Sequence, residues 1–330
     1  METLVTQSFG REAEYRRAIL CVWSYWAYVG FRKVVLFTDA PDFFDPYFKN
    51  QPVEYVLLTP DKMTAMRGKI DFLHRMKIAM IEEAFQLTST NILYVDSDTF
   101  FIADPSALLR LVSEKKTFMH KNEYRFDSLR DMRLPAAESF HAFLDLIEAR
   151  TFLGANGSPL PVSTLQYSWN AGAMILHKSH ATLLPDIYAL TDQFYPPTLN
   201  HASEQYAFSI ILQTHSEIDS CEDIVYHYWY RVKKTIMDTW LSNTLTTDWI
   251  KLPLEKKFES VRNWVFILPD YLENHILSLH DRAIQAFHDN QFRIGWSYAI
   301  RTLLRDPSAI HWRDLLYHLR RNLRYLIEKK

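Results

Sequence analysis

The chain of 330 residues is predicted to form an α/β domain, a three-layer structure with a mainly parallel sheet, followed by a helical C-terminal extension. Three observations predict this. Short apolar segments alternate with helical patterns over the first hundred residues. A hydrophobic content of 48% with 15% aromatic residues supports a large core. Beyond about residue 255 the pattern is helical. We therefore expect a domain at 1–254 and a helical extension at 255–330.

The expected elements of the first domain follow one another regularly. Short runs rich in β-branched and aromatic residues predict strands at 3–6, 33–38, 53–58, 92–95, 173–176 and 224–226. Apolar residues at helical spacing predict helices at 12–28, 70–85 and 204–212, the last with Ser203 as its N-cap. The segment 120–165 mixes charges with turn residues, and we expect it to be loop-rich and to cover a site.

Composition excludes several classes of protein. The net charge of −2 argues against nucleic-acid binding. With 7 glycines, the chain has neither a Gly-x-Gly-x-x-Gly nor a P-loop motif, which disfavours dinucleotide binding and P-loop hydrolysis. Cys21 and Cys221 are expected to be buried thiols in a reducing, cytoplasmic compartment. Charges between residues 11 and 17 interrupt any secretory signal.

The strongest chemical signal is the segment 92–104, where a strand ends in Asp96 and Asp98. Residues i and i+2 point to the same side of a strand, so both carboxylates can converge on one Mg²⁺ or Mn²⁺. Ligands in open α/β sheets bind at the carboxyl ends of strands. The pattern therefore indicates a metal held beside a diphosphate, with Ser97 as a further residue in contact with that ligand. The alternative is a solvated turn, since the chain has 39 acidic residues.

Other charged and polar side chains are candidates for binding the diphosphate or a nucleoside attached to it. Arg75 and Lys77, on the helix before this strand, are expected to share the charge of a diphosphate, or else to form a solvated helix face. Thr6 ends the first strand and Asp39 follows the second, and Asp39 is either an acceptor for the N3–H of a uracil ring or a turn residue. Lys233 lies six residues after His227, a further candidate for the site, and from there we expect it to reach a phosphate.

The later part of the domain supplies candidates for chemistry. Asn170 precedes Gly172, which permits close backbone approach, and offers a donor and an acceptor unless it forms an ordinary turn. Glu204 and Gln205 open a helix, either as sugar or catalytic contacts or as partners of the helix dipole. His227 follows a strand and is a candidate third metal ligand, with a structural histidine as the alternative.

These motifs, in this order, resemble those of the GT-A (Rossmann-like) glycosyltransferases, nearest to the glycogenin-like and bacterial galactosyltransferase-like retaining group. The similar segments within residues 1–235 are Arg75-Met-Lys77, Tyr94-Val-Asp96-Ser-Asp98-Thr, Trp169-Asn170-Ala-Gly172-Ala-Met, Glu204-Gln205 and His227-Tyr228 with Lys233. The chain departs from the family pattern at Tyr206, where an acidic residue is frequent, and at Tyr230, where the family has glycine.

The resemblance implies a hexosyltransferase-like enzyme that moves a sugar from a nucleoside diphosphate sugar, most nearly a UDP-sugar, to a glycan, lipid-linked or protein acceptor. It implies Mn²⁺ or Mg²⁺ held by Asp96, Asp98 and His227. Asn170 and Gln205 would then contact the sugar or its reacting face. In a retaining reaction the leaving phosphate takes the acceptor proton, whereas an inverting reaction requires a base, for which Glu204 is the candidate.

Two alternatives remain open. A strand followed by Asp-Ser-Asp-Thr also resembles the first motif of haloacid-dehalogenase-type phosphatases, in which Asp96 would be the nucleophile and Asp98 the acid/base. That motif normally lies on the first strand, whereas about 90 residues precede it here. The second alternative is a non-catalytic GT-A scaffold, which requires a broken metal site.

The C-terminal segment is basic. Residues 301–330 hold eight Lys/Arg and three Asp/Glu, and residues 311–330 place leucines at helical spacing among arginines. Such a helix either packs on the body of the protein or makes a peripheral contact with the inner face of a membrane.

Overall fold

The computed structural model describes residues 2–132, 137–306, 317–318, 320 and 322. The chain divides into two compact units, residues 1–227 with 250–261, and residues 228–249 with 262–330. Within the first unit, the ring of Phe258 lies 5.6 Å from that of Trp23. The domain boundary expected after residue 254 falls inside the segment 250–261 and stays a proposal.

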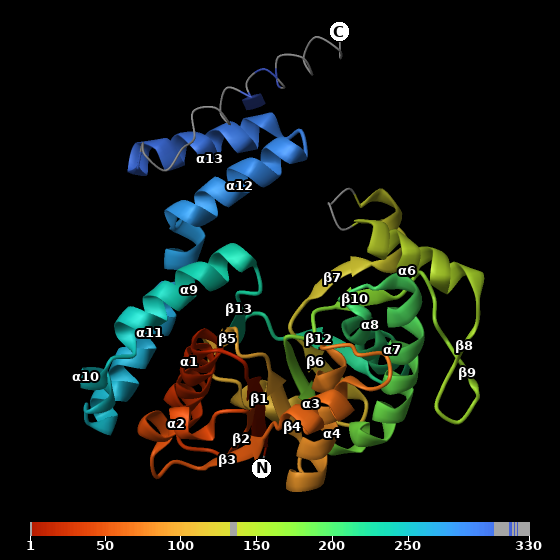
Figure 1. The fold of residues 1–330 in the computed structure, drawn as a ribbon, viewed down its shortest axis with the longest axis horizontal. Helices are drawn as coiled ribbons and strands as arrows, with labels where there is room; N and C mark the ends of the chain where they lie inside the picture. Colours follow the sequence, from red (N-terminus) through yellow and green to blue (C-terminus); the bar gives the residue numbers. More distant parts are fainter. Residues whose placement is uncertain (1, 133–136, 307–316, 319, 321, 323–330) are drawn as a thin grey trace. The chain divides into compact units, whose positions relative to one another are not determined.

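The first unit is built on a seven-stranded sheet in the order β12-β6-β11-β4-β1-β2-β3 (Figure 1). Its strands are β1 (Thr3–Ser8), β2 (Val34–Thr38), β3 (Val53–Leu57), β4 (Ile92–Val95), β6 (Lys116–Met119), β11 (Ala173–Leu176) and β12 (Glu217–Ser220). Strand β11 runs antiparallel to both of its neighbours, and the other four pairs are parallel. The expected α/β fold with a mainly parallel sheet is confirmed.

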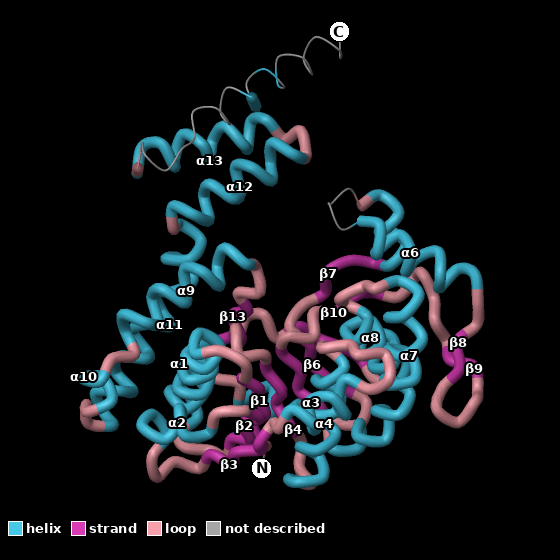
Figure 2. The backbone as a smooth tube through the Cα atoms, in the orientation of Figure 1, coloured by secondary structure: helices cyan, strands magenta, loops and turns pink. Residues whose placement is uncertain are grey.

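Helices cover both faces of this sheet, as Figure 2 shows. They are α1 (Glu12–Val29) and α2 (Pro41–Phe48) on one side, and α4 (Arg75–Thr88), α7 (Leu184–Thr198) and α8 (Ser203–His215) on the other. The alternation of side chains along each strand explains the layers. Val5 of β1 belongs to a large apolar cluster that includes Ile81, Leu190 and Ile211 from α4, α7 and α8. Leu4, equally buried, points to the opposite face. The predicted three layers are present.

Smaller elements complete the first unit. They are α3 (Pro60–Arg67), β5 (Thr99–Phe101), α5 (Ser106–Leu111), β7 (Asn122–Arg125), the 3₁₀ helix η1 (Phe126–Asp131), α6 (Ala137–Ala149), β8 (Phe152–Leu153), β9 (Pro159–Leu160), β10 (Tyr167–Trp169), the 3₁₀ helix η2 (Lys178–Leu183) and β13 (Val225–His227). Three antiparallel pairs, β5–β13, β7–β10 and β8–β9, stand outside the large sheet. Two of them position the site described below.

Three local predictions differ from the structure. The helix expected from residue 70 begins at Arg75, because Asp71 has a left-handed φ of +47°, which a right-handed helix cannot contain. The segment 120–165, expected to be loop-rich, contains the helix α6, which was not predicted and which buries Phe140, Phe143, Leu144 and Ile147 at helical spacing. Ser203 is the first residue of α8 and not its cap, and its hydroxyl donates to the carbonyl of Asn200 (2.7 Å).

The described part of the second unit is helical, as predicted for the residues beyond about 255. The helices after β13 are α9 (Arg231–Thr244), α10 (Thr247–Ile250), α11 (Leu254–Asn274), α12 (Ile276–His288) and α13 (Phe292–Arg305). Helices α12 and α13 pack through Phe287, Phe292 and Ala299. The basic segment 311–330 lies outside the described residues, apart from residues 317, 318, 320 and 322. Among the described helices, none combines the length and apolarity needed to cross a bilayer.

Candidate functional site

Strand pairing brings Asp96, Asp98 and His227 together. Strand β4 ends at Val95, and the N–H of Asp96 donates to the carbonyl of Gly172 on the neighbouring chain segment (2.8 Å). Three residues after Asp96, the chain enters β5, which pairs antiparallel with β13 and sets His227 opposite Thr99. A residue more than 120 positions away in sequence is thereby placed beside the two aspartates.

The three side chains form a potential cation site, which we call the metal triad. Their ligand atoms all lie within 4.8 Å of one another, and His227 Nε2 is 3.4 Å from Asp98 Oδ1. Asp98 and His227 are buried, whereas the Asp96 side chain is 20% exposed and gives access to the site. Two carboxylates and one imidazole are a donor set that suits Mn²⁺, and the carboxylates also suit Mg²⁺.

Lys77 lies beside the triad on α4, with only 5% of its surface exposed. Its ammonium is 3.2 Å from Asp96 Oδ2 and 3.3 Å from Glu204 Oε1, and it donates to the carbonyl of Ala171 (3.2 Å). Burial lowers the pKa of Lys77, but the two carboxylates outweigh this effect, so its pKa is raised overall. The lysine is therefore a buried cation and not a solvated helix residue.

Asp96 has a second protein partner. The Tyr94 hydroxyl donates to Asp96 Oδ1 (2.7 Å), and burial together with this carboxylate raises the pKa of Tyr94 well above its ordinary value. Both carboxylate oxygens are thus held from the protein side, by Tyr94 and by Lys77. The motif that resembles a phosphatase lies here on the fourth strand of the chain instead of the first.

Asn170 connects the triad to a polar network. Its Oδ1 accepts a hydrogen bond from the N–H of Gly172 (3.0 Å) and lies 3.0 Å from His227 Nδ1. Its Nδ2 donates to Glu123 Oε1 (3.0 Å). Asn170 is buried, so each of these contacts replaces water.

Gln205 enters the same network from α8. Its Oε1 accepts from the N–H of Ala171 (3.2 Å), and its Nε2 donates to Glu123 Oε2 (2.8 Å) and to Ser168 Oγ (3.0 Å). Glu123 was not a candidate from the sequence. It lies on β7 in the segment expected to be loops, and no apolar alternation around it predicts a strand.

Three buried polar atoms on candidate elements have no hydrogen-bond partner in the described structure: Gln7 Oε1 and Ser8 Oγ at the end of β1, and Glu204 Oε2 in the first turn of α8. Gln7 and Ser8 end β1, the strand beside β4. Thr6, also on β1, is fully buried near Cys21, whose thiol pKa is raised to about 12 by burial, although the hydroxyls of Thr99 and Thr6 oppose the rise. Native buried polar atoms are normally satisfied, so atoms such as these mark positions for a ligand or water.

Other predicted donor contacts are engaged elsewhere. The guanidinium of Arg75 forms two hydrogen bonds with Asp192 (2.7 and 3.2 Å). Asp39 accepts from the N–H of Gly10 (3.0 Å) and from the hydroxyl of Tyr15 (2.8 Å). No hydrogen bond or ion pair between described residues joins either side chain to the metal triad. Their roles toward a donor stay predictions.

Two remaining candidates have different surroundings. Ser97 is half-buried between the two aspartates. Lys233 lies in α9 of the second unit and pairs with Glu273 of α11. Tyr206, where the family often has an acidic residue, is fully buried, and its hydroxyl pairs with that of Tyr124 (2.8 Å).

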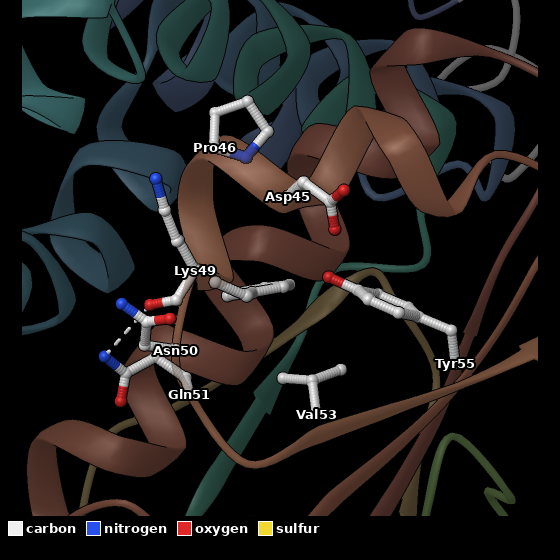
Figure 3. A pocket seen from close by; sticks show the side chains of 8 residues that line it. Asp45, Pro46, Lys49, Asn50, Gln51, Val53 and Tyr55 are labelled. Carbon is white, nitrogen blue, oxygen red and sulfur yellow. Dashed lines mark hydrogen bonds between the residues drawn. The ribbon is translucent and has the colours of Figure 1, made fainter.

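A surface depression of about 570 Å³ lies apart from these residues. Figure 3 shows Asp45 and Lys49 of the α2 region and Val53 and Tyr55 of β3 around it. Strand β3 is the edge of the sheet, and two strands, β1 and β2, separate it from β4. The depression contains none of the candidate residues and is not the site of the chemistry proposed from the triad.

Comparison with protein-family models finds no match, and neither does comparison with curated proteins. Among solved structures, the chain is similar to mouse xyloside xylosyltransferase 1 (12% identity, 67% of this chain and 85% of that one, TM-score 0.43). It is also similar to the galactosyltransferase LgtC in complex with donor and acceptor sugar analogs (11%, 77% and 98%, 0.44). A third is a glycosyltransferase involved in the glycosylation of the major capsid of PBCV-1 (12%, 74% and 99%, 0.40). All three are glycosyltransferases, the class that the motifs resemble, and with TM-scores below 0.5 the chemistry of this chain rests on the residues of its own site.

Proposed function

We propose that the chain is a metal-dependent glycosyltransferase that moves a sugar from a nucleoside diphosphate sugar, a UDP-sugar, to a glycan, lipid-linked or protein acceptor. One observation carries the proposal: Asp96, Asp98 and His227 converge at the carboxyl end of a central strand, beside the buried cation Lys77. Ligands of open α/β sheets bind at this end of the strands. A cation site next to a buried ammonium is suited to a diphosphate.

The residues of the triad fit a divalent cation. Asp96 and Asp98 offer oxygen ligands and His227 a nitrogen ligand. Each carboxylate oxygen has two lone pairs, so the hydrogen bonds from Tyr94 and Lys77 leave Asp96 able to bind a cation. When bound, Mn²⁺ or Mg²⁺ would neutralise charge on the diphosphate and on the leaving group.

The donor contacts that we propose lie around the end of β1. Gln7 Oε1 and Ser8 Oγ have no hydrogen-bond partner among the described residues, and Thr6 is adjacent in the strand. Asp39 follows β2, the parallel neighbour of β1, and would accept the N3–H of uracil. These positions support a nucleoside beside the diphosphate.

Glu204 and Gln205 face the reacting sugar in this proposal. Glu204 Oε1 is engaged by Lys77, which leaves Oε2 to accept a hydrogen bond from a sugar hydroxyl. In an inverting reaction, Oε2 would instead take the proton of the acceptor hydroxyl. Both groups of the Gln205 amide are already hydrogen-bonded within the protein, so it would present a fixed surface to the sugar. In a retaining reaction the leaving phosphate takes the acceptor proton.

The cellular setting is also a proposal. Two buried cysteines and the absence of a disulfide between them support a cytoplasmic location. The net charge of +5 over residues 301–330 supports a peripheral contact with the inner face of a membrane, where a lipid-linked acceptor would be found.

The test is a screen of nucleotide sugars for release of nucleoside diphosphate with Mn²⁺, with Mg²⁺ and with a chelator. We expect metal-dependent release of UDP from one donor by the wild type and by Asp71→Ala, a control at a side chain that is 77% exposed, and none by Asp98→Ala. Full turnover by Asp98→Ala, or no turnover of any nucleotide sugar by folded wild type, would contradict the proposal. A folded wild type that binds neither Mn²⁺ nor UDP would instead favour the scaffold, and metal-dependent hydrolysis of p-nitrophenyl phosphate would favour the phosphatase.

A further inference from the structure

Glu123 is the common partner of two candidate residues that lie 35 positions apart in sequence. Its Oε1 accepts from Asn170 Nδ2 (3.0 Å), and its Oε2 accepts from Gln205 Nε2 (2.8 Å) and Ser168 Oγ (3.2 Å). The antiparallel pairing of β7 with β10 places Glu123 beside the strand that leads into Asn170. Each oxygen of the carboxylate therefore holds one of the two amides.

The partners of Asn170 determine which way its amide points. The N–H of Gly172 is a donor and contacts one end of the amide, which must be the oxygen. The carboxylate of Glu123 is an acceptor and contacts the other end, which must be the NH₂ group. Two independent contacts thus require the same orientation, and a flipped amide would break both.

This orientation determines where the proton of His227 lies. Asn170 Oδ1 is 3.0 Å from His227 Nδ1, and an amide oxygen only accepts hydrogen bonds. His227 Nδ1 must therefore carry a proton. In the neutral imidazole this leaves the lone pair on Nε2, the nitrogen that faces Asp98 Oδ1 at 3.4 Å. That lone pair points toward Asp98, on the side of His227 where a cation would bind.

We infer that Glu123 is a positioning residue that acts through Asn170 to keep the proton of His227 on Nδ1 and so present Nε2 to a cation. The inference rests on the metal site of the proposed function. Side chains that hydrogen-bond to a metal-binding histidine, without binding the metal themselves, fix its tautomer and orientation. Through its other oxygen, Glu123 fixes the Gln205 amide in the same way, so one carboxylate orients both the cation side and the sugar side of the site.

The first measurement needs no metal. In metal-free protein at alkaline pH, where imidazole is neutral, ¹⁵N NMR distinguishes a protonated from an unprotonated ring nitrogen. We expect His227 to carry its proton on Nδ1 in the wild type and to show a mixture of tautomers in Glu123→Ala. Ser168→Ala is the matched control, because it removes a hydrogen bond from Glu123 without touching Asn170 or His227. It should retain the wild-type tautomer.

The second measurement is the affinity for Mn²⁺ in the presence of UDP, followed through the EPR signal of free Mn²⁺. We expect Glu123→Ala to bind about 10- to 100-fold more weakly than the wild type, as for other outer partners of a ligating histidine. Asn170→Ala should show a similar loss, and the double variant little more than either, because both changes interrupt one chain of hydrogen bonds.

The outcomes separate the inference from the proposed function. Wild-type tautomer and Mn²⁺ affinity in Glu123→Ala would overturn the role of Glu123, as would additive losses in the double variant. A wild-type protein that binds no Mn²⁺ would overturn the proposed function, while the NMR measurement would still test the hydrogen-bond chain. If Glu123→Ala does not fold, Glu123→Gln replaces it, because it keeps the shape and one acceptor oxygen and should give a smaller loss in the same direction.

Discussion

Replacing Lys77 with methionine is expected to destabilise the first unit, because it leaves two carboxylates without their shared cation. The ammonium lies 3.2 Å from Asp96 and 3.3 Å from Glu204, and the lysine is 5% exposed. Removing one partner of a buried ion pair costs about 3–5 kcal/mol, because an uncompensated charge stays buried. Glu204, with a side chain only 4% exposed, bears most of this cost. We expect a loss of about that size in the free energy of unfolding, measured by urea with tryptophan fluorescence.

The pH dependence of this loss identifies its cause. In the wild type the pKa of Lys77 is raised above its ordinary value of 10.5 by Asp96 and Glu204 against the effect of burial. Its stabilising contribution is therefore complete below that ordinary value and is lost only as the pH rises through the raised pKa. Across the neutral range it is constant. In Lys77→Met, by contrast, the deficit should shrink as the pH falls, because protonation removes the charge of the stranded carboxylates.

The double variant Lys77→Met/Glu204→Gln supplies the decisive control. It removes one charge of each sign, so most of the lost stability should return, and the coupling energy between the two sites should be large and favourable. A loss below about 1 kcal/mol for Lys77→Met would refute the reasoning, since that is the range of solvated surface pairs. Simple addition of the two single losses would refute it as well.

Three further predictions concern the site and the core. His227→Ala should weaken Mn²⁺ binding in the presence of UDP more than the loss of Glu123 does, whereas a lower unfolding temperature with unchanged Mn²⁺ affinity would mark the histidine as structural. Cys21 and Cys221 are buried with thiol pKa values raised to about 12, so neither should react with iodoacetamide in native protein at mildly alkaline pH, and both should react in urea; rapid native labelling would contradict this. Gly172→Ala should abolish Mn²⁺ binding, measured by EPR, whereas Gly154→Ala, which crowds a flexible carboxylate remote from the triad, should leave it intact.

The parts of the fold that the sequence predicts are those with local signals. Strand β4 is an uninterrupted apolar run, and its predicted bounds agree with the observed Ile92–Val95 because the two aspartates end it. The position of Asp96 and Asp98 at a strand end follows from the same pattern. The start of α4 was harder to predict, because the residues between Gly68 and Arg75 have helical composition but form turns.

The parts that escaped prediction depend on pairing between distant segments. Nothing in the sequence around Glu123 indicates a site; its role appears only when β7 pairs with β10 and carries it to Asn170 and Gln205. The partner of Arg75 is Asp192, 117 residues away, and no spacing rule predicts that contact. Local patterns therefore locate the aspartates, while tertiary contacts decide which neighbouring charges reach them.

The glycine at position 172 shows how the sequence motif and the tertiary structure depend on each other. Its backbone has no left-handed φ that would demand glycine. The requirement comes from His227, because a Cβ at residue 172 would lie 2.0 Å from Cε1 and 2.2 Å from Nδ1 of the imidazole. The ring cannot move aside without leaving Asn170 or Asp98, since it is buried between them. Because Gly172, directly before β11, has no Cβ, the imidazole of His227 at the end of β13 has room beside it. A small residue in the Asn-Ala-Gly motif and a histidine 55 positions later are two halves of one packing constraint.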